Sequence, residues 1–186
     1  MIFIVFCNVK FGTQITFFKG NIIMKLNDTT KKVIVLGVLS GMRANAGLIC
    51  TALLIRKQPG IYFSPSRLVK FFSDKKALAA LSVSGAAETV IDKLPTTPDR
   101  IEHAGLSARV ASGAICGAAI SKTAGRKPVP GMVIGGVAAL ASTFAFFYLR
   151  KSLCKALNVS DPFIGAAEDA LAVAFGRSLL KKGKIS

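Results

Sequence analysis

The sequence lacks the residue patterns that usually mark catalytic and metal sites. Its four cysteines are scattered singly, and no CxxC pair or cysteine–histidine cluster appears, which argues against a structural metal site. No P-loop, GxGxxG, HExxH or GxSxG segment is present either, so the common phosphate, dinucleotide, zinc and nucleophile motifs are missing. We therefore expect a protein that is not an enzyme and that has neither a metal nor a cofactor.

Acidic residues are also scarce. Nine stand against 25 Lys and Arg, so the formal net charge is +16, a balance that by itself could indicate a nucleic-acid binder. The basic residues, however, bracket long apolar runs, as they do when they anchor helix ends at anionic lipid headgroups. We expect the partner to be a lipid bilayer and not nucleic acid. The bracketing residues are Lys31, Lys32, Arg56, Lys57, Lys75, Lys76, Lys122, Arg126, Lys127, Arg150, Lys151, Lys181 and Lys182.

Long apolar runs are what the chain has in abundance. Hydrophobic residues make up 52% of it and charged residues only 18%, with a mean hydropathy of +0.53, unlike a soluble domain of this length. The runs are long and not amphipathic, which favours lipid surroundings. We predict an all-α, Gly- and Ala-rich integral membrane bundle of four to five transmembrane or re-entrant helices. The runs cover residues 33–55, 77–91, 105–120, 129–149 and 163–180, and the basic connection 56–76 could add a short interfacial helix.

The N-terminal segment differs from the rest. Residues 1–23 are apolar but interrupted by Lys10 and by Thr13-Gln14, and they have neither a basic start nor a small-residue cleavage site. Met24 and the residues after it look like an ordinary protein start. We expect residues 24–186 to form a single transmembrane domain, preceded by an extension, 1–23, that need not be translated.

Loop charge leaves the course of the first run open. The basic connections 56–76 and 121–128 and the C-terminus favour the cytoplasmic side, but Lys31-Lys32 favours that side too. One alternative is that residues 33–55 form a re-entrant or broken hairpin around Arg43. The other is that the positive-inside rule fails at one loop.

Charged residues within or beside the apolar runs are the main functional clue. Each would cost at least about 2.5 kcal/mol if it were isolated at the bilayer centre, so we expect ion pairs or a wet cavity. The natural pairs are Arg43 with Glu88 or Glu168, and Arg109 with Asp169 or Asp92. These six residues either line a path for a polar solute, ion or proton, or they only lock the helices together.

Small residues suggest how the helices pack. Pairs at i, i+4 let helix backbones approach closely in lipid, either within one bundle or between two copies of the chain. They are Gly37 with Gly41, Gly113 with Gly117, and Gly131 with Gly135.

Two short segments hint at an internal repeat. Gly85-Ala86-Ala87-Glu88 recurs as Gly165-Ala166-Ala167-Glu168, and an arginine in a small-residue setting, Arg43 or Arg109, precedes each. A true duplication would place a site where the two halves meet. A chance match in an Ala- and Gly-rich chain is the alternative.

Several of these motifs together resemble a bacterial membrane family called domain of unknown function 4126. The similarity spans about residues 33–180 and implies a multi-pass protein of the bacterial cytoplasmic (inner) membrane with no assigned activity. Relatives often have a proline soon after the first-run arginine, and Asn45-Ala46-Gly47 has none here. The matching residues are Ser40-Gly41-Met42-Arg43, Asp92-Lys93-Leu94-Pro95 with Pro98 and Arg100, Ala108-Arg109, and Glu168-Asp169-Ala170-Leu171-Ala172.

Overall fold

The protein is all-helical in the part that the structure describes. The computed structural model describes residues 27–58, 66–91, 103–157 and 161–181, and within them the chain forms seven helices and no strand. The all-α prediction is therefore confirmed, while the extension 1–23 and Asp92 lie outside the described residues. The helices are α1 (Asp28–Met42), α2 (Ala44–Arg56), α3 (Arg67–Ser73), α4 (Lys75–Ile91), α5 (His103–Thr123), α6 (Pro128–Leu157) and α7 (Asp161–Lys181).

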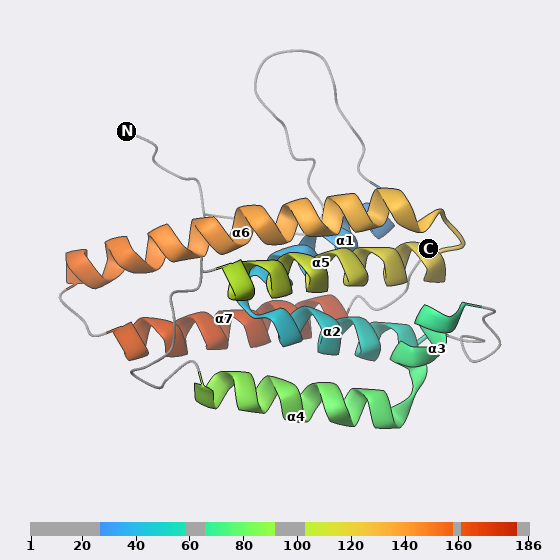
Figure 1. The fold of residues 1–186 in the computed structure, drawn as a ribbon, viewed down its shortest axis with the longest axis horizontal. Coiled ribbons are helices and arrows are strands. Elements are labelled where there is room, and N and C mark those ends of the chain that lie inside the picture. The colour runs from blue at the N-terminus through green and yellow to red at the C-terminus, as the bar shows by residue number, and fades with distance from the viewer. Residues whose placement is uncertain (1–26, 59–65, 92–102, 158–160, 182–186) are drawn as a thin grey trace, which may run out of the picture.

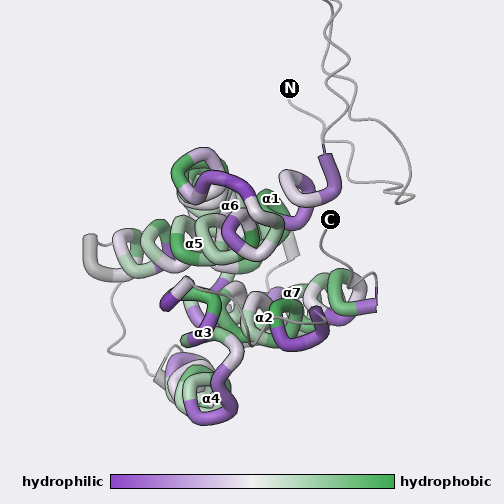
Figure 2. Tube along the Cα trace, turned by 90° about the vertical axis from the view of Figure 1, so that its right-hand side faces the viewer, coloured by the Kyte–Doolittle hydropathy of each residue, from purple (hydrophilic) through white to green (hydrophobic). Residues whose placement is uncertain are grey.

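The helices are arranged in two layers, with α4 outside them (Figures 1 and 2). Helices α1, α5 and α6 form one layer, and α2 and α7 form the next. The short helix α3 connects α2 to α4, which lies beyond α2. Helix α3 contacts α2, α4 and α5. It buries Val69 and Phe72, while Phe71 is exposed.

The first predicted run is a hairpin and not one continuous helix. Helix α1 ends at Met42, Arg43 takes an extended conformation with φ −145° and ψ 125°, and α2 begins at Ala44. Helix α2 then runs back alongside α1 (Figure 1). A methyl group on Gly47 would meet Ser40 and the carbonyl of Leu36, so the two helices are antiparallel and in close contact. Of the two alternatives left open by loop charge, the structure has the broken hairpin.

The hairpin brings both of its basic termini to one end of the bundle. The Lys57 ammonium donates to the Leu180 carbonyl at 3.2 Å, so α2 and α7 end side by side. The start of α1 and the α5–α6 turn lie at this same end (Figure 1). We call it the basic end. Its described basic residues include Lys31, Lys32, Arg56, Lys57, Lys70, Lys75, Lys76, Lys122, Arg126, Lys127 and Lys181.

Glycines let α1, α5 and α6 touch through their backbones. A Cβ atom at Gly37 or at Gly113 would lie 2.6 Å from the carbonyl oxygen of Gly135. Gly117 and Gly131 face each other in the same way, and Gly41 faces Ser142. No side chain larger than hydrogen fits at these positions without a shift of backbone. The three glycine pairs of the sequence therefore lie at one shared contact of three helices.

One face of α6 is apolar and uncovered. Val129, Val133, Val137, Phe144 and Tyr148 follow each other at four- or seven-residue spacing, and each is between 36% and 61% exposed. Among the described helices, α6 alone has a window, Pro128–Cys154, long and apolar enough to cross a bilayer; α2 is apolar but shorter. The membrane is thus indicated by one helix, and the predicted four to five crossing or re-entrant helices stay a prediction.

Candidate functional site

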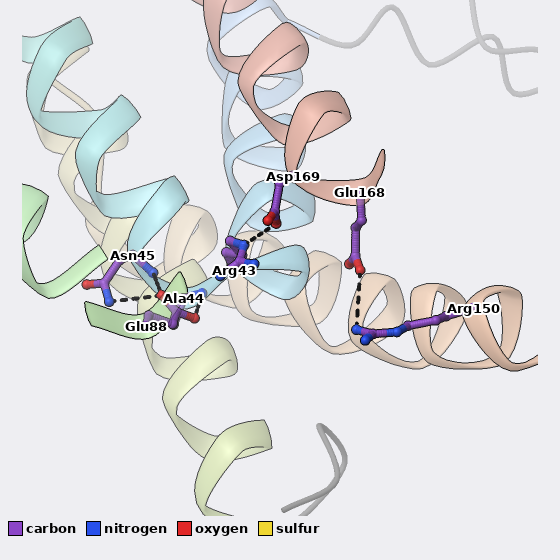
Figure 3. A network of polar contacts seen from close by, with 7 residues as sticks. All are labelled: Arg43, Ala44, Asn45, Glu88, Arg150, Glu168 and Asp169. Atoms are coloured by element: carbon purple, nitrogen blue, oxygen red, sulfur yellow. Dashed lines mark hydrogen bonds and ion pairs between the residues drawn. The ribbon is translucent and has the colours of Figure 1, made fainter. Parts of the chain in front are cut away.

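The break between α1 and α2 is held by an ion pair with α7. Arg43 Nε donates to Asp169 Oδ1 at 2.5 Å (Figure 3). The Arg43 side chain is 10% exposed and that of Asp169 is 25% exposed. A charge-assisted contact in so little water is stronger than the same pair on a surface. The pair fastens the tip of the hairpin to a helix that lies far away in sequence.

A carboxylate from α4 caps the first turn of α2. Glu88 accepts from the backbone N–H groups of Ala44 at 3.1 Å and Asn45 at 3.2 Å, and from the Asn45 side-chain amide at 2.9 Å. Helix N-termini present unsatisfied N–H donors and a partial positive charge, so a carboxylate there is favourable. Arg43 itself makes no side-chain capping bond to α2. Glu88 therefore does from another helix what a local N-cap residue usually does.

Hydroxyl groups of α5 and α6 bond to backbone carbonyls on both sides of the break. At the end of α1, Thr143 donates to the Gly41 carbonyl and Ser142 to that of Val38, both at 3.2 Å. Ser112 of α5 donates to the Ala44 carbonyl. The break leaves the Gly41 carbonyl without its helical donor, because the Asn45 N–H donates to Glu88 instead, and Thr143 replaces that donor. The helix can therefore break at Arg43 although no proline follows it.

A second ion pair lies beside the first. Arg150 of α6 approaches Glu168 of α7 at 4.0 Å, and their side chains are 16% and 7% exposed. Sequence reasoning interpreted Arg150 as an anchor in the headgroup region. The structure adds that the guanidinium turns toward the buried carboxylate of Glu168 (Figure 3).

The predicted pairing needs correction. Glu88 does not pair with Arg43 but caps α2, and Asp169 pairs with Arg43 and not with Arg109. Arg109 is buried, with 5% exposure, in the first turns of α5, and its other expected partner, Asp92, lies outside the described residues. Of the six residues expected to form the site, the five described lie at the hairpin tip and in helices α4, α5 and α7.

The surroundings of the suggested repeat differ between its two copies. Glu88 caps a helix, whereas Glu168 faces Arg150. Arg43 lies at a helix break, whereas Arg109 lies inside a continuous helix. The two segments are thus not in equivalent structural settings.

These polar residues occupy one level of the bundle. Arg43, Glu88, Arg109 and Asp169 lie 12 to 15 positions from the basic end of their helices. At 1.5 Å per residue this is about 20 Å. We call the charged residues at this level, together with Arg150, the polar layer: Arg43, Glu88, Arg109, Arg150, Glu168 and Asp169. Arg150 belongs to it through its contact with Glu168, although it lies 22 positions from the basic end of α6.

Three polar residues beside the polar layer were missed by sequence reasoning. Asn45 donates to Glu88, and Ser112 and Thr143 donate to backbone carbonyls of the hairpin tip. Each is a polar residue within an apolar run, and that is the only signal that could have indicated them. Within the described residues, no group of three or more His, Cys, Asp or Glu is placed to hold a metal ion.

Comparison with known proteins identifies a family and nothing more. The family described as domain of unknown function (DUF4126) matches residues 32–179, which confirms the resemblance seen in the motifs. No curated protein and no solved structure matches the chain.

Proposed function

The chain belongs to the DUF4126 family, and we propose that it is a multi-pass membrane protein that conducts a small ion or polar solute through its polar layer. The observation that carries the proposal is the hairpin tip, where Arg43 and the start of α2 meet two carboxylates at a common depth. We propose no catalytic role and no nucleic-acid partner.

The uncovered face of α6 supports the membrane location. Soluble monomers rarely expose an apolar patch that runs along a helix of 30 residues. The exposed side chains Phe163, Leu171, Val173 and Phe175 of α7 add a second apolar surface. Lipid would cover both.

Charge supports one orientation. The basic end gathers most of the described basic residues, as expected for the cytoplasmic side of a bacterial inner-membrane protein. In this topology α1 and α2 enter from the cytoplasm and return to it. Helices α4, α5, α6 and α7 cross in alternating directions, so the described chain starts and ends on that side. The conflict at Lys31-Lys32 then disappears.

The hairpin supports a conducting role. With a hydrocarbon core of roughly 30 Å, a polar layer about 20 Å from the basic end lies inside the bilayer. Non-helical backbone is tolerated there only if it is buried in protein or lines an aqueous path. Broken helices whose half-helix ends face ions or charged groups are the usual binding sites of secondary transporters.

A structural role is the second candidate, and a specific observation favours it. Glu88, Glu168 and Asp169 each already have a partner in the described part of the chain. Such a layer could fix helix packing alone, without transport, since buried polar groups are retained for specificity in some proteins.

Flux through proteoliposomes tests the proposal. Proton flux would be measured with trapped pyranine. Glycerol uptake would be measured from the change in vesicle volume, and chloride uptake with a trapped chloride-sensitive dye. We expect at least one of the three rates to exceed that of protein-free vesicles and to fall in Arg43→Gln, while Lys151→Gln, at an exposed position of α6, leaves it unchanged. Rates equal to those of empty vesicles for all three probes would contradict the conducting role and favour the structural role.

A further inference from the structure

A cavity of about 260 Å³ opens at the basic end, where the α5–α6 turn meets the start of α1. It lies away from the polar layer. Its described polar lining includes Thr30, Ser121, Arg126 and Lys127, and its apolar lining is formed by Val33, Pro130 and Ile134. Cationic and apolar surfaces thus share one small site.

The α5–α6 turn places the two cations at the cavity. The Arg126 N–H donates to the Ser121 carbonyl at 2.9 Å, and the Gly125 N–H donates to that of Lys122 at 3.1 Å. This pair of bonds ends α5 with a left-handed residue, and Gly125 has φ +69°. Helix α6 begins three residues later at Pro128. The tight turn leaves Arg126 and Lys127 exposed at the cavity.

The hydroxyl of Ser121 belongs to the lining of the cavity. Ser121 is 5% exposed. It lies against Gly131, another residue of the lining. The hydroxyl is therefore a donor available to a ligand in the cavity.

We propose that this cavity binds the phosphate of an anionic phospholipid headgroup. The inference rests on the proposed membrane location. Arg126 and Lys127 match the phosphate charge, and the Ser121 hydroxyl offers a donor. The volume is below the roughly 300 Å³ at which pockets for whole drug-sized ligands begin, which suits a headgroup whose chains lie outside.

The apolar wall selects a lipid over a free phosphate. Val33, Pro130 and Ile134 would gain nothing from an ion in solution. They adjoin the uncovered face of α6, which begins at Val129 and continues through Val133. An acyl chain leaving the headgroup would follow that face into the bilayer. Basic pockets between transmembrane helices on the cytoplasmic side are a known form of lipid site.

Lipid titration of the purified full chain in a neutral detergent tests the proposal. Phosphatidylglycerol, phosphatidylcholine with the same acyl chains, and soluble glycerol 3-phosphate would each be added, with bound lipid measured by native mass spectrometry. The variants are Arg126→Gln/Lys127→Gln and Ser121→Ala. The matched control is Lys75→Gln/Lys76→Gln, which removes the same charge from the same end, outside this cavity.

We expect phosphatidylglycerol to bind more tightly than the other two ligands. Each surface cation is worth about fivefold in affinity, so the Arg126/Lys127 variant should bind it about 30-fold more weakly. Ser121→Ala, which removes only the hydroxyl oxygen from the cavity lining, should weaken binding severalfold, and the control should change it by less than twofold.

Three results would overturn the lipid site: equal binding of the two lipids, an equal loss in the control, or binding of glycerol 3-phosphate as tight as that of the lipid. If the double variant fails to fold, the affinities of Ser121→Ala and Lys127→Gln for phosphatidylglycerol are compared instead, and the proposal requires both to be weaker than that of the parent chain. A protein that stays monodisperse without detergent would refute the membrane location. A detergent-dependent protein without a preference for phosphatidylglycerol would refute the headgroup site alone.

Discussion

Arg43 and Asp169 are 126 positions apart in sequence, yet the guanidinium Nε of one lies 2.5 Å from the carboxylate of the other. The contact joins the only non-helical residue between α1 and α2 to the middle of α7. It is the point at which the first and last described helices of the chain are joined in the polar layer.

Removal of one member of this pair should destabilise the fold. Arg43→Met leaves Asp169 without its cation in a largely dry setting, which costs about 3–5 kcal/mol for a fully buried pair. Since Asp169 is one quarter exposed, we expect about 2–3 kcal/mol, read from denaturant unfolding in detergent. Arg43→Met/Asp169→Leu should recover most of that loss, and Lys151→Met should cost nothing measurable. A single variant as stable as the parent would show that the arginine is solvated.

The same double variant separates the two proposed roles. It should be folded in either case, because neither charge is left to be desolvated. If the polar layer conducts, proteoliposomes with this variant should lose the flux of the parent. If the layer only fixes packing, a deletion strain complemented with the variant should behave as one complemented with the parent chain.

Loss of the cap on α2 should loosen the hairpin tip. Glu88→Ala removes the acceptor for the Ala44 and Asn45 amides, a loss of about 1–2 kcal/mol by analogy with N-cap substitutions. The loss of stability in Glu88→Gln should be smaller than in Glu88→Ala, because the amide oxygen can still accept a hydrogen bond. Hydrogen exchange should become faster in residues 44–47 and stay unchanged in α6. Ser84→Ala, one turn earlier on α4 and exposed, is the control. Exchange rates that do not respond to Glu88→Ala would contradict the cap.

Two adjacent glycines of α6 should respond in opposite directions to the same change. A methyl group on Gly135 would collide with the Gly113 carbonyl, whereas on Gly136 the nearest atom is 3.6 Å away. Gly135→Ala should lower the free energy of unfolding by about 1–3 kcal/mol, because the added methyl group overpacks the contact. Gly136→Ala should raise stability by about 0.5–1 kcal/mol, since alanine is the better helix former. Equal effects at the two positions would contradict the close contact of α5 and α6.

Cysteine labelling should place both ends of the hairpin on one side. In a background without native cysteines, Lys31→Cys and Lys57→Cys should both be protected from an impermeant maleimide added outside whole cells. Lys151→Cys, near the opposite end of the bundle, should react. A continuous crossing helix over residues 33–55 would instead make Lys31→Cys and Lys57→Cys react from opposite sides.

Much of the fold could be predicted because it depends on local pattern. The run 129–149 has no charge, so it had to be helix in an apolar setting, and α6 contains it whole. The helices at 77–91, 105–120 and 163–180 were displaced by only a few residues at their ends. The break at Arg43 was one of two alternatives, since no proline marks it. The side chains that bond the backbone groups freed by the break, Glu88 and Thr143, are distant in sequence.

By itself the sequence determined the all-helical class, the helix positions and five of the six charges of the polar layer, all but Arg150. Hydrophobic runs, charge placement and small-residue spacing are local properties of the chain. Only the tertiary structure decided which charges meet. Asp169 and Glu168 are neighbours on one helix, about 100° apart around its axis, so one faces Arg43 and the other faces Arg150. That choice depends on how α7 is rotated against α1 and α6, and the rotation follows from the packing of all the helices at once.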